Sequence, residues 1–345
     1  METPVTASKI QEFISRLSDR HILKRSPQPY VDHFISAALS VYTGSKLAKA
    51  LQHKFFIPDD SAYSDDAFFQ SASELSVSNH IKQASISGFD IEKRVNPTNL
   101  KNVDSYFELG AFKVAVEVKS PVEANQAISG DFIFKTAGRV PNHHQKYEEL
   151  SPFLARASPT KRVILGKNKD CTSKDFLLLA NEKFDPASGV DHLNILFVAC
   201  GYIDSISDWY MHLFASEGLF TASPFHPPAD FRNVDVVVLS NLKYCHEHCR
   251  DFHDWTLRDV FLLPCLNTHV RPSMGRHTVL TGLSVFDHHL QEFVAFESDN
   301  TRVPRGAFEA LKVLHYVRGY LNTLRRDRYF PVKLLQIDRP KSETQ

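Results

Sequence analysis

The clearest alternation of apolar and polar positions in the chain runs over residues 111–119, which read AFKVAVEVK. Because successive side chains of a strand point to opposite faces, this segment predicts a strand with one wholly apolar face. The other face carries Glu117 and Lys119 side by side. Two more strands are predicted just before it, over residues 90–95 and 103–109, with turn-forming Asn-Pro and Gly residues in the gaps. The pattern therefore predicts a core of short strands with a small polar cluster on one face.

Helical spacing of apolar residues dominates the chain before these strands. Apolar residues recur at i, i+3, i+4 and i+7 over residues 10–17, and again over residues 31–51 with a break around Gly44. Residues 71–85 predict a further helix that leads directly into the first core strand. Residues 1–70 are therefore expected to form a helical N-terminal section.

Two continuous apolar runs follow later, over residues 193–200 and 234–239, and they predict strands buried on both faces. Residues 206–219 predict the crossover helix between them. A hairpin extended by such a βαβ unit predicts an α/β fold, with three α/β/α layers around a mixed central sheet. We expect the core to span residues 71–245, with a C-terminal extension, residues 246–345, packed on it.

Within the extension, residues 278–285 predict a strand and residues 308–324 a helix. A basic cluster with flanking tyrosines follows the helix. It either tracks a phosphate backbone or complements the helix dipole, and we favour the second interpretation. The basic residues are Arg325, Arg326 and Arg328, and the tyrosines are Tyr320, inside the predicted helix, and Tyr329.

Composition narrows the class of protein only in part. The 345 residues include 40 basic and 40 acidic side chains, so a nucleic-acid enzyme would need a local basic patch. No run approaches ~18 uninterrupted apolar residues, so no membrane span is expected. The first residues do not resemble a secretory signal, and five cysteines are an odd number in a long chain. These features favour reduced thiols and an intracellular location, in the cytoplasm or nucleus.

Two carboxylates and a lysine are predicted to converge at the end of the third strand. Asp104 lies on the preceding strand, and the short connection predicts a hairpin that brings it close to Glu117. Hard oxygen ligands of this kind hold Mg²⁺, which keeps several waters and takes only one or two carboxylates. Lys119 can orient or deprotonate a metal-bound water, or stabilise charge on a phosphate. The set therefore suits metal-dependent hydrolysis of phosphodiester bonds.

An Asp followed, after a hairpin-length gap, by Glu-x-Lys resembles the PD-(D/E)XK, or restriction endonuclease-like, nuclease superfamily. Here the motif is Asp104, Glu117, Val118 and Lys119, and Val103 stands where the family name has a proline. The resemblance implies a nuclease that uses Mg²⁺, or Mn²⁺ as a substitute. Its partner and substrate would be nucleic acid, with DNA expected before RNA. The resemblance also assigns Asp104 and Glu117 as metal ligands and Lys119 to the attacking water or the transition-state charge.

The same resemblance points to two more residues. Many members carry an acidic residue on the helix before the first core strand that completes the metal site, and Glu74 is placed there. The alternative is an exposed glutamate in the first turn of that helix. Some branches carry a glutamine on the helix after Glu-x-Lys, with a tyrosine four residues on. Gln145 could contact phosphate or water in this way, but Glu149 stands at the tyrosine position, so an ordinary surface glutamine is the alternative.

Three other interpretations compete with the nuclease hypothesis. The polar cluster could be an ion pair on a solvated sheet face, which is common in antiparallel sheets. The chain could keep the nuclease fold without activity, as a binding or interaction module. A third possibility is structural zinc held by two residue pairs, each with a spacing of four. Those pairs would be Cys245 with Cys249 and Cys265 with His269.

Overall fold

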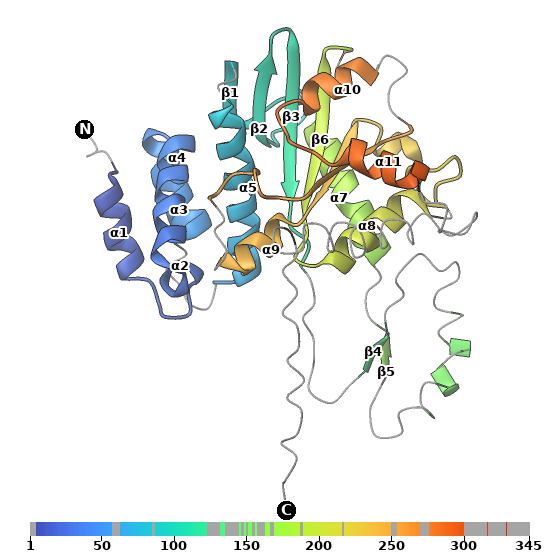
Figure 1. The fold of residues 1–345 in the computed structure, drawn as a ribbon, viewed down its shortest axis with the longest axis horizontal. Coiled ribbons are helices and arrows are strands. Elements are labelled where there is room, and N and C mark those ends of the chain that lie inside the picture. Colours follow the sequence, from blue (N-terminus) through green and yellow to red (C-terminus); the bar gives the residue numbers. More distant parts are fainter. Residues whose placement is uncertain are drawn as a thin grey trace, which may run out of the picture.

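A central sheet of six strands organises the chain in the computed structural model (Figure 1). The strand order is β1-β2-β3-β6-β7-β8. The structure describes residues 5–56, 63–84, 87–122, 132–134, 145, 148–149, 151–153, 156, 163–165, 169–186, 189–215, 217–249, 254–269, 276–299, 316 and 329.

The sheet is mixed. β1, β2 and β3 pair antiparallel, β3, β6 and β7 pair parallel, and β8 closes the other edge antiparallel to β7. Two short strands, β4 and β5, form a separate parallel pair. The strands are β1 (Ser87–Lys93), β2 (Val103–Leu109), β3 (Phe112–Lys119), β4 (Phe132–Phe134), β5 (Val163–Leu165), β6 (His192–Ala199), β7 (Val236–Ser240) and β8 (Leu262–Leu266).

The described helices fall into an N-terminal group and a group around the sheet. The N-terminal group is α1 (Ala7–Ser15), α2 (Ile22–Arg25), α3 (Gln28–Val41), α4 (Gly44–Ala50) and the π-helical turn η1 (Leu51–Phe55). The second group is α5 (Asp65–Gln83), α7 (Lys169–Lys183), α8 (Ile203–Phe214), the 3₁₀ turn η2 (Pro228–Asp230), α9 (Leu242–Glu247), α10 (Arg276–Leu283) and α11 (Leu290–Asp299).

Alternate side chains of β6 enter two separate apolar clusters, as expected for a strand buried on both faces. Phe197 packs in one cluster with Val77 of α5 and Leu283 of α10. Leu196 packs in the other with Leu177 of α7, together with side chains from α8 and α11. Helices therefore contribute to the core on both sides of the sheet, and the predicted α/β class is confirmed.

Several predicted elements are confirmed and one is wrong. The predicted helix over residues 31–51 is present and breaks before Gly44, whose φ of +52° suits glycine. The predicted strand over residues 278–285 is instead helix α10. Val279 and Leu283 lie one helical turn apart and are buried, whereas Leu280 between them is exposed. A short apolar run does not distinguish a strand from a buried helix, so packing decided this segment.

The predicted section boundaries lie within continuous structure. α5 begins at Asp65, so the boundary between residues 70 and 71 falls inside this helix. β8 lies beyond residue 245, so the predicted extension supplies an edge strand of the sheet. The N-terminal helices bury a cluster of their own, which includes Ile91 of β1 and Trp255. Among the residues described, no helix is long and apolar enough to span a membrane.

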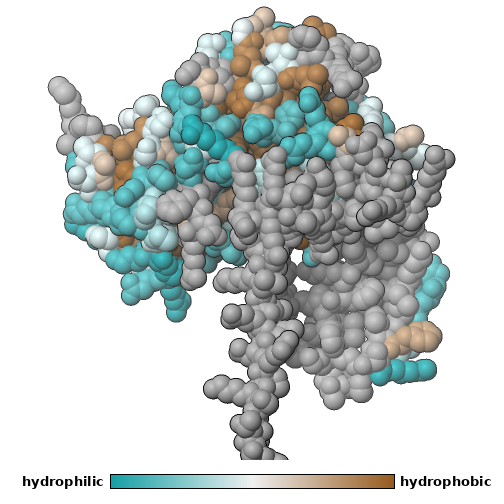
Figure 2. Space-filling model, viewed as in Figure 1, coloured by the Kyte–Doolittle hydropathy of each residue, from teal (hydrophilic) through white to brown (hydrophobic). Residues whose placement is uncertain are grey.

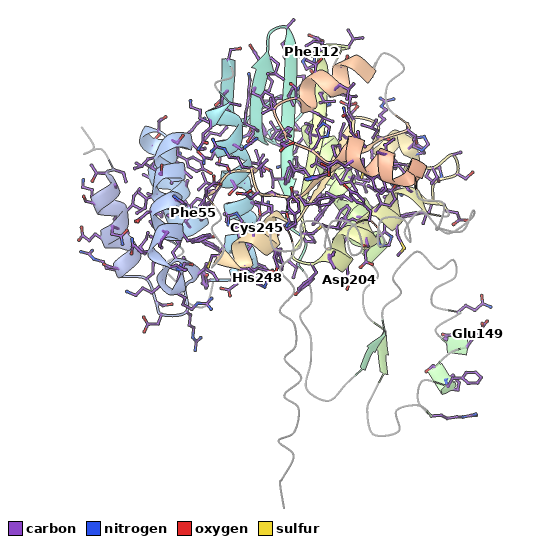
Figure 3. All side chains as sticks on the ribbon, viewed as in Figure 1. Phe55, Phe112, Glu149, Asp204, Cys245 and His248 are labelled. Carbon is purple, nitrogen blue, oxygen red and sulfur yellow. The ribbon has the colours of Figure 1, made fainter. Side chains whose placement is uncertain are left out.

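Exposed apolar side chains gather around α10, where the hydropathy surface is most apolar on the visible face (Figure 2). Leu280 and Val190 are exposed there, and the Thr278 hydroxyl donates to the Val190 carbonyl at 3.2 Å. β3 begins at Phe112 near this patch (Figure 3) and ends at Lys119 at the opposite end of the sheet. The apolar patch therefore lies away from the polar cluster of β3.

Candidate active site

The β2–β3 hairpin places the two predicted carboxylates opposite each other. Ser105 pairs with Val116, and continuing this register by one residue places Asp104 across from Glu117. Directly opposed residues of an antiparallel pair point to the same face of a sheet. An Asp104 carboxylate oxygen also accepts a hydrogen bond from the Val118 amide at 2.7 Å. The predicted hairpin is confirmed, and it brings these two side chains to one end of the sheet.

Glu117 is fully buried and is contacted by two ammonium groups. The Lys119 Nζ lies 2.5 Å from Glu117 Oε1, and the Lys183 Nζ lies 2.7 Å from both Oε1 and Oε2. A buried carboxylate requires such compensation because desolvation of an unpaired charge is costly. The interpretation of a solvated sheet face is therefore wrong for Glu117, although the ion pair with Lys119 exists.

Lys183, at the end of α7, was not predicted from the sequence. It lies 66 residues after Glu117, and α7 packs on the sheet face that carries Asp104 and Glu117. A lone lysine in the last turn of a helix is also expected from the helix dipole. No local signal therefore separated Lys183 from a surface lysine.

Electrostatics at Asp104 favour its protonated form. Burial, followed by the nearby carboxylates of Glu74 and Glu117, raises the pKa of Asp104 well above its usual value, against the opposing effect of Lys183 and Lys119. Burial alone would lower the pKa of Lys119, but Glu117 and Asp104 outweigh it, so this pKa is raised. Lys119 therefore remains charged, whereas Asp104 resists ionisation until a further positive charge approaches.

Glu74 lies near enough to raise the pKa of Asp104, but its side chain has interaction partners of its own. Its side chain is 14% exposed, lies 2.9 Å from the Lys54 Nζ, and accepts from the Gln70 amide at 2.9 Å. α5 begins at Asp65, so Glu74 is not in the first turn. The alternative of an exposed first-turn glutamate is therefore wrong.

Lys54 links the N-terminal helices to this cluster. It projects from the π-helical turn η1 and contacts Glu92 at 3.0 Å as well as Glu74. Burial tends to lower the Lys54 pKa, but Glu74 and Tyr42 outweigh it and raise this pKa above its usual value. Glu92 has a φ of +54°, which is uncommon for a residue other than glycine. π-Helical turns and such backbone conformations often occur at functional sites.

Gln70 fixes the end of β3 to α5. Its side-chain amide donates to the Val118 carbonyl at 2.8 Å, and its side-chain oxygen accepts from the Ser120 amide at 2.5 Å. These two bonds satisfy backbone groups on either side of Lys119. A glutamine within a helical pattern carries no sequence signal for this role.

Lys243 anchors the chain just beyond Lys119. It is almost fully buried, and its Nζ lies 2.6 Å from an Asp66 carboxylate oxygen and 3.0 Å from the Pro121 carbonyl. The Glu247 carboxylate lies farther away, at 3.8 Å. Lys243 thus ties the segment after β3 to the first turn of α5 and to α9.

The cluster around Asp104 contains four carboxylates and three ammonium groups. The set therefore has one more carboxylate than ammonium groups, and the raised pKa of Asp104 identifies it as the carboxyl group that favours its protonated form. The members are Glu74, Glu92, Asp104, Glu117, Lys54, Lys119 and Lys183.

A preformed cage of three or more His, Cys, Asp or Glu ligands is absent from the described part of the chain. Mg²⁺ does not need one, because it takes one or two carboxylates and completes its octahedron with waters and substrate phosphate. Asp104 and Glu117 meet this smaller requirement. The excess carboxylate of the cluster also suits a cation. The two carboxylates are therefore of the kind that Mg²⁺ takes, with the ammonium groups of Lys119 and Lys183 on the Glu117 oxygens in this structure.

Gln145 is not brought to the cluster. Its side chain is exposed, and its amide lies 3.4 Å from the Glu149 carboxylate. Glu149 lies away from the sheet (Figure 3). The predicted contact of Gln145 with phosphate or water at the site is therefore unsupported by its position, and the surface alternative fits better.

The predicted zinc ligands do not converge. Cys245 (Figure 3) packs against the apolar cluster on the α5 side of the sheet, whereas Cys265 belongs to the cluster on the α7 side. Burial, followed by the effect of Asp259, raises the pKa of Cys245 to about 12, and burial also raises the pKa of Cys265. Both cysteines therefore favour the thiol form over the thiolate that binds metal. His269 lies 2.8 Å from the Thr221 carbonyl. The zinc hypothesis is therefore wrong for this set of residues.

The predicted basic cluster after residue 324 is described only at Tyr329. This side chain is buried, and its hydroxyl lies 2.9 Å from His289 Nε2. Tyr329 is therefore not available to stack on a base. The arginines and Tyr320 lie outside the described residues.

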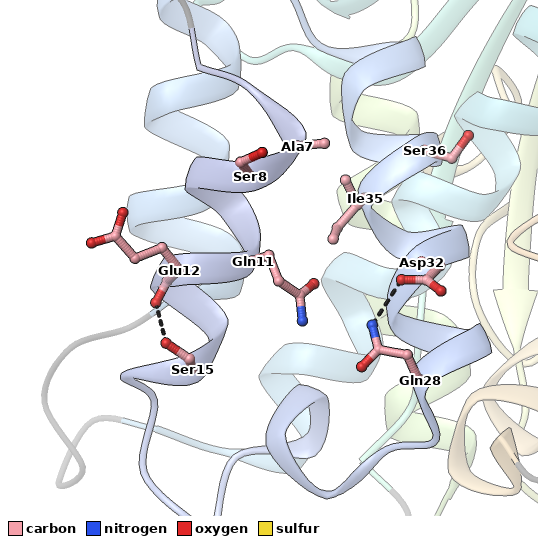
Figure 4. Close-up of a pocket in the computed structure, with 9 residues that line it drawn as sticks. All are labelled: Ala7, Ser8, Gln11, Glu12, Ser15, Gln28, Asp32, Ile35 and Ser36. Carbon is pink, nitrogen blue, oxygen red and sulfur yellow. Dashed lines mark hydrogen bonds between the residues drawn. The ribbon is translucent and has the colours of Figure 1, made fainter.

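A groove of about 900 Å³ lies between α1 and α3 (Figure 4). Most of the residues that line it are polar, and they do not include any member of the cluster around Asp104. The lining residues are Ala7, Ser8, Gln11, Glu12, Ser15, Gln28, Asp32, Ile35 and Ser36.

Comparisons with known proteins add no family assignment. A scan against protein-family models found no match, and searches of curated proteins and of solved structures found none. Function is therefore inferred from the residues and their geometry.

Proposed function

We propose that the chain is a Mg²⁺-dependent nuclease of PD-(D/E)XK type that hydrolyses phosphodiester bonds of nucleic acid, with DNA as the expected substrate. The observation that carries the proposal is the placement of Asp104 across from Glu117, with the Lys119 ammonium 2.5 Å from Glu117. This is the residue set and order of the motif. It lies where the carboxyl ends of the parallel strands β3, β6 and β7 meet, which is where open α/β sheets bind their ligands.

In this proposal, Asp104 and Glu117 hold the metal ion, and Glu74 lies close enough to add a third negative charge. When bound, Mg²⁺ lowers the pKa of a coordinated water and screens the charge of the scissile phosphate. The Lys119 Nζ orients the attacking water or stabilises the negative charge that develops on the phosphate oxygens. The water oxygen bonds to phosphorus as the opposite P–O ester bond breaks, and the water proton ends on the leaving oxygen.

The surrounding contacts serve to position these groups. Gln70 holds the backbone on both sides of Lys119, and Lys243 holds the segment that follows. Catalytic groups must be held to within a fraction of an ångström of productive geometry. A strand end fixed to two helices is suited to that demand.

A second candidate function is a binding module that keeps the fold without catalysis. The observation in its favour is that both Glu117 oxygens are already contacted by ammonium groups, which would compete with a metal. Mg²⁺ separates the two candidates. A nuclease should gain thermal stability from Mg²⁺, by about 2.7 kcal/mol at a hundredfold excess over Kd, whereas Glu117→Gln should gain much less. A binding module in which both ammonium groups stay on Glu117 gains no stability from Mg²⁺ or Mn²⁺ and cleaves no nucleic acid.

The proposal is tested by cleavage of end-labelled single- and double-stranded DNA and RNA with Mg²⁺ or Mn²⁺. Glu117→Gln and Lys119→Ala should each lower the rate by about 10²-fold or more, because the first removes a charged metal ligand and the second removes the ammonium that acts on the water or the transition-state charge. Lys113→Ala is the matched control, since Lys113 lies on the same strand and face but at the other end of β3. Equal cleavage by the wild type and Glu117→Gln, or no cleavage by the wild type, would refute the nuclease proposal.

A further inference from the structure

Two ammonium groups contact Glu117, and they come from different elements, β3 and α7. Lys119, two residues away on the same strand, already provides one ammonium group at 2.5 Å from Oε1. Lys183 adds a second, at 2.7 Å from each of the two oxygens. Both oxygens of this buried carboxylate are therefore contacted by ammonium groups, and Lys183 reaches both of them.

The position of Lys183 is the one that a metal ion would need. A cation bound at Glu117 must approach the same carboxylate oxygens that the Lys183 Nζ now contacts. With Lys183 still in place, a divalent ion would lie beside two ammonium groups and be repelled by both. Metal binding therefore requires this ammonium to leave.

Lys183 is also placed to leave. It lies at the end of α7, its side chain is 20% exposed, and the ion pair and hydrogen bond described for its ammonium both go to Glu117. The lysine stem is flexible and its ammonium is strongly hydrated, so transfer to water costs little. Lys119, in contrast, is anchored on the strand between the two backbone groups that Gln70 holds.

We propose that Lys183 is an intramolecular counter-ion that occupies the cation position at Glu117 in the metal-free protein and is displaced by the incoming divalent ion. The metal affinity is then set by competition with this lysine, and the buried carboxylate is never left without a cation. This inference rests on the proposed function, because it assumes that Glu117 binds a metal.

The test is the affinity for Mn²⁺, measured by isothermal titration calorimetry without nucleic acid. Lys183→Met should bind Mn²⁺ about tenfold more tightly or better than the wild type, because the competing charge is gone. Lys183→Arg keeps that charge and should bind no more tightly than the wild type. Lys174→Met is the matched control, since Lys174 lies on the same helix and pairs only loosely, at 3.6 Å, with Asp175. It should bind as the wild type does.

A second measurement uses the wild type alone, so it holds even if a variant folds poorly. An amine-reactive reagent should label Lys183 several-fold faster when Mg²⁺ is added, and mass spectrometry compares this rate with that of Lys174, which should not change. Equal or weaker Mn²⁺ binding by Lys183→Met, or unchanged labelling of Lys183, overturns the inference. Metal binding of the expected kind without cleavage would refute only the nuclease proposal, whereas no metal binding by any variant refutes both.

Discussion

Asp104→Asn tests whether the carboxyl group at the centre of the cluster is protonated in the metal-free fold. The substitution keeps the size of the side chain and an oxygen that can accept from the Val118 amide. It removes the ability to ionise. In the native chain, burial and then the carboxylates of Glu74 and Glu117 raise the pKa of Asp104 well above its usual value of 3.8. The neutral amide of the Asp104→Asn variant would therefore mimic the form that the fold already favours.

The sign of the pH effect follows from that raised pKa. At pH values between 3.8 and the pKa of Asp104 in the folded state, the unfolded chain has released the Asp104 proton while the folded chain keeps it. Wild-type stability then falls by about 1.4 kcal/mol for each pH unit across this window. The contribution of Asp104 is fully present below 3.8 and is lost as the pH rises through the folded-state pKa. Asp104→Asn lacks this loss and should be the more stable protein at neutral pH.

The assay is urea unfolding in EDTA at a series of pH values from acid to neutral. The stability difference between variant and wild type should grow in favour of Asp104→Asn as the pH rises, and then level off. Asp90→Asn is the control, since Asp90 is a half-exposed aspartate on β1 whose ion pair with Lys46 is worth less than about 1 kcal/mol. A pH-independent difference, or an Asp104→Asn protein that is less stable at neutral pH, would refute the reasoning.

Two further predictions concern the two lysines that contact the buried Glu117 and the buried Lys243. Lys119→Met and Lys183→Met each leave the buried Glu117 with one ammonium, whereas the double variant leaves none. In urea unfolding, the double variant should therefore lose about 1–3 kcal/mol more of the free energy of unfolding than the two single variants lose together. Additive losses would contradict the idea that the two lysines share this role. At the second site, Asp66→Asn leaves the buried Lys243 ammonium with a backbone carbonyl and a more distant carboxylate, at a cost of about 1–3 kcal/mol. Lys243→Met removes the buried charge itself and should cost less, so a larger loss of stability in Lys243→Met would count against this explanation.

The sequence by itself determined the strand pair that carries the motif. Alternation over β3 is a local property, and a connection as short as that between β2 and β3 leaves only an antiparallel hairpin. Once those two strands pair, the register places Asp104 across from Glu117 without further information. The break of the N-terminal helices before Gly44 was predictable for the same reason, since a positive φ is a requirement of the local backbone.

Only the tertiary structure decided which charges surround that motif. Lys54 precedes the motif and Lys183 follows it, and both lie on helices that are distant from it in sequence. Their contacts depend on how each helix is rotated against the sheet. Hydrophobic periodicity orients the apolar face of a helix but does not select which polar residue near its end reaches a buried carboxylate. Residues 278–285 illustrate the same limit, because their short apolar run fits a strand or a helix until the packing of Leu283 settles it. Long-range packing thus turned a local pair of carboxylates and one lysine into a cluster with counter-ions of its own.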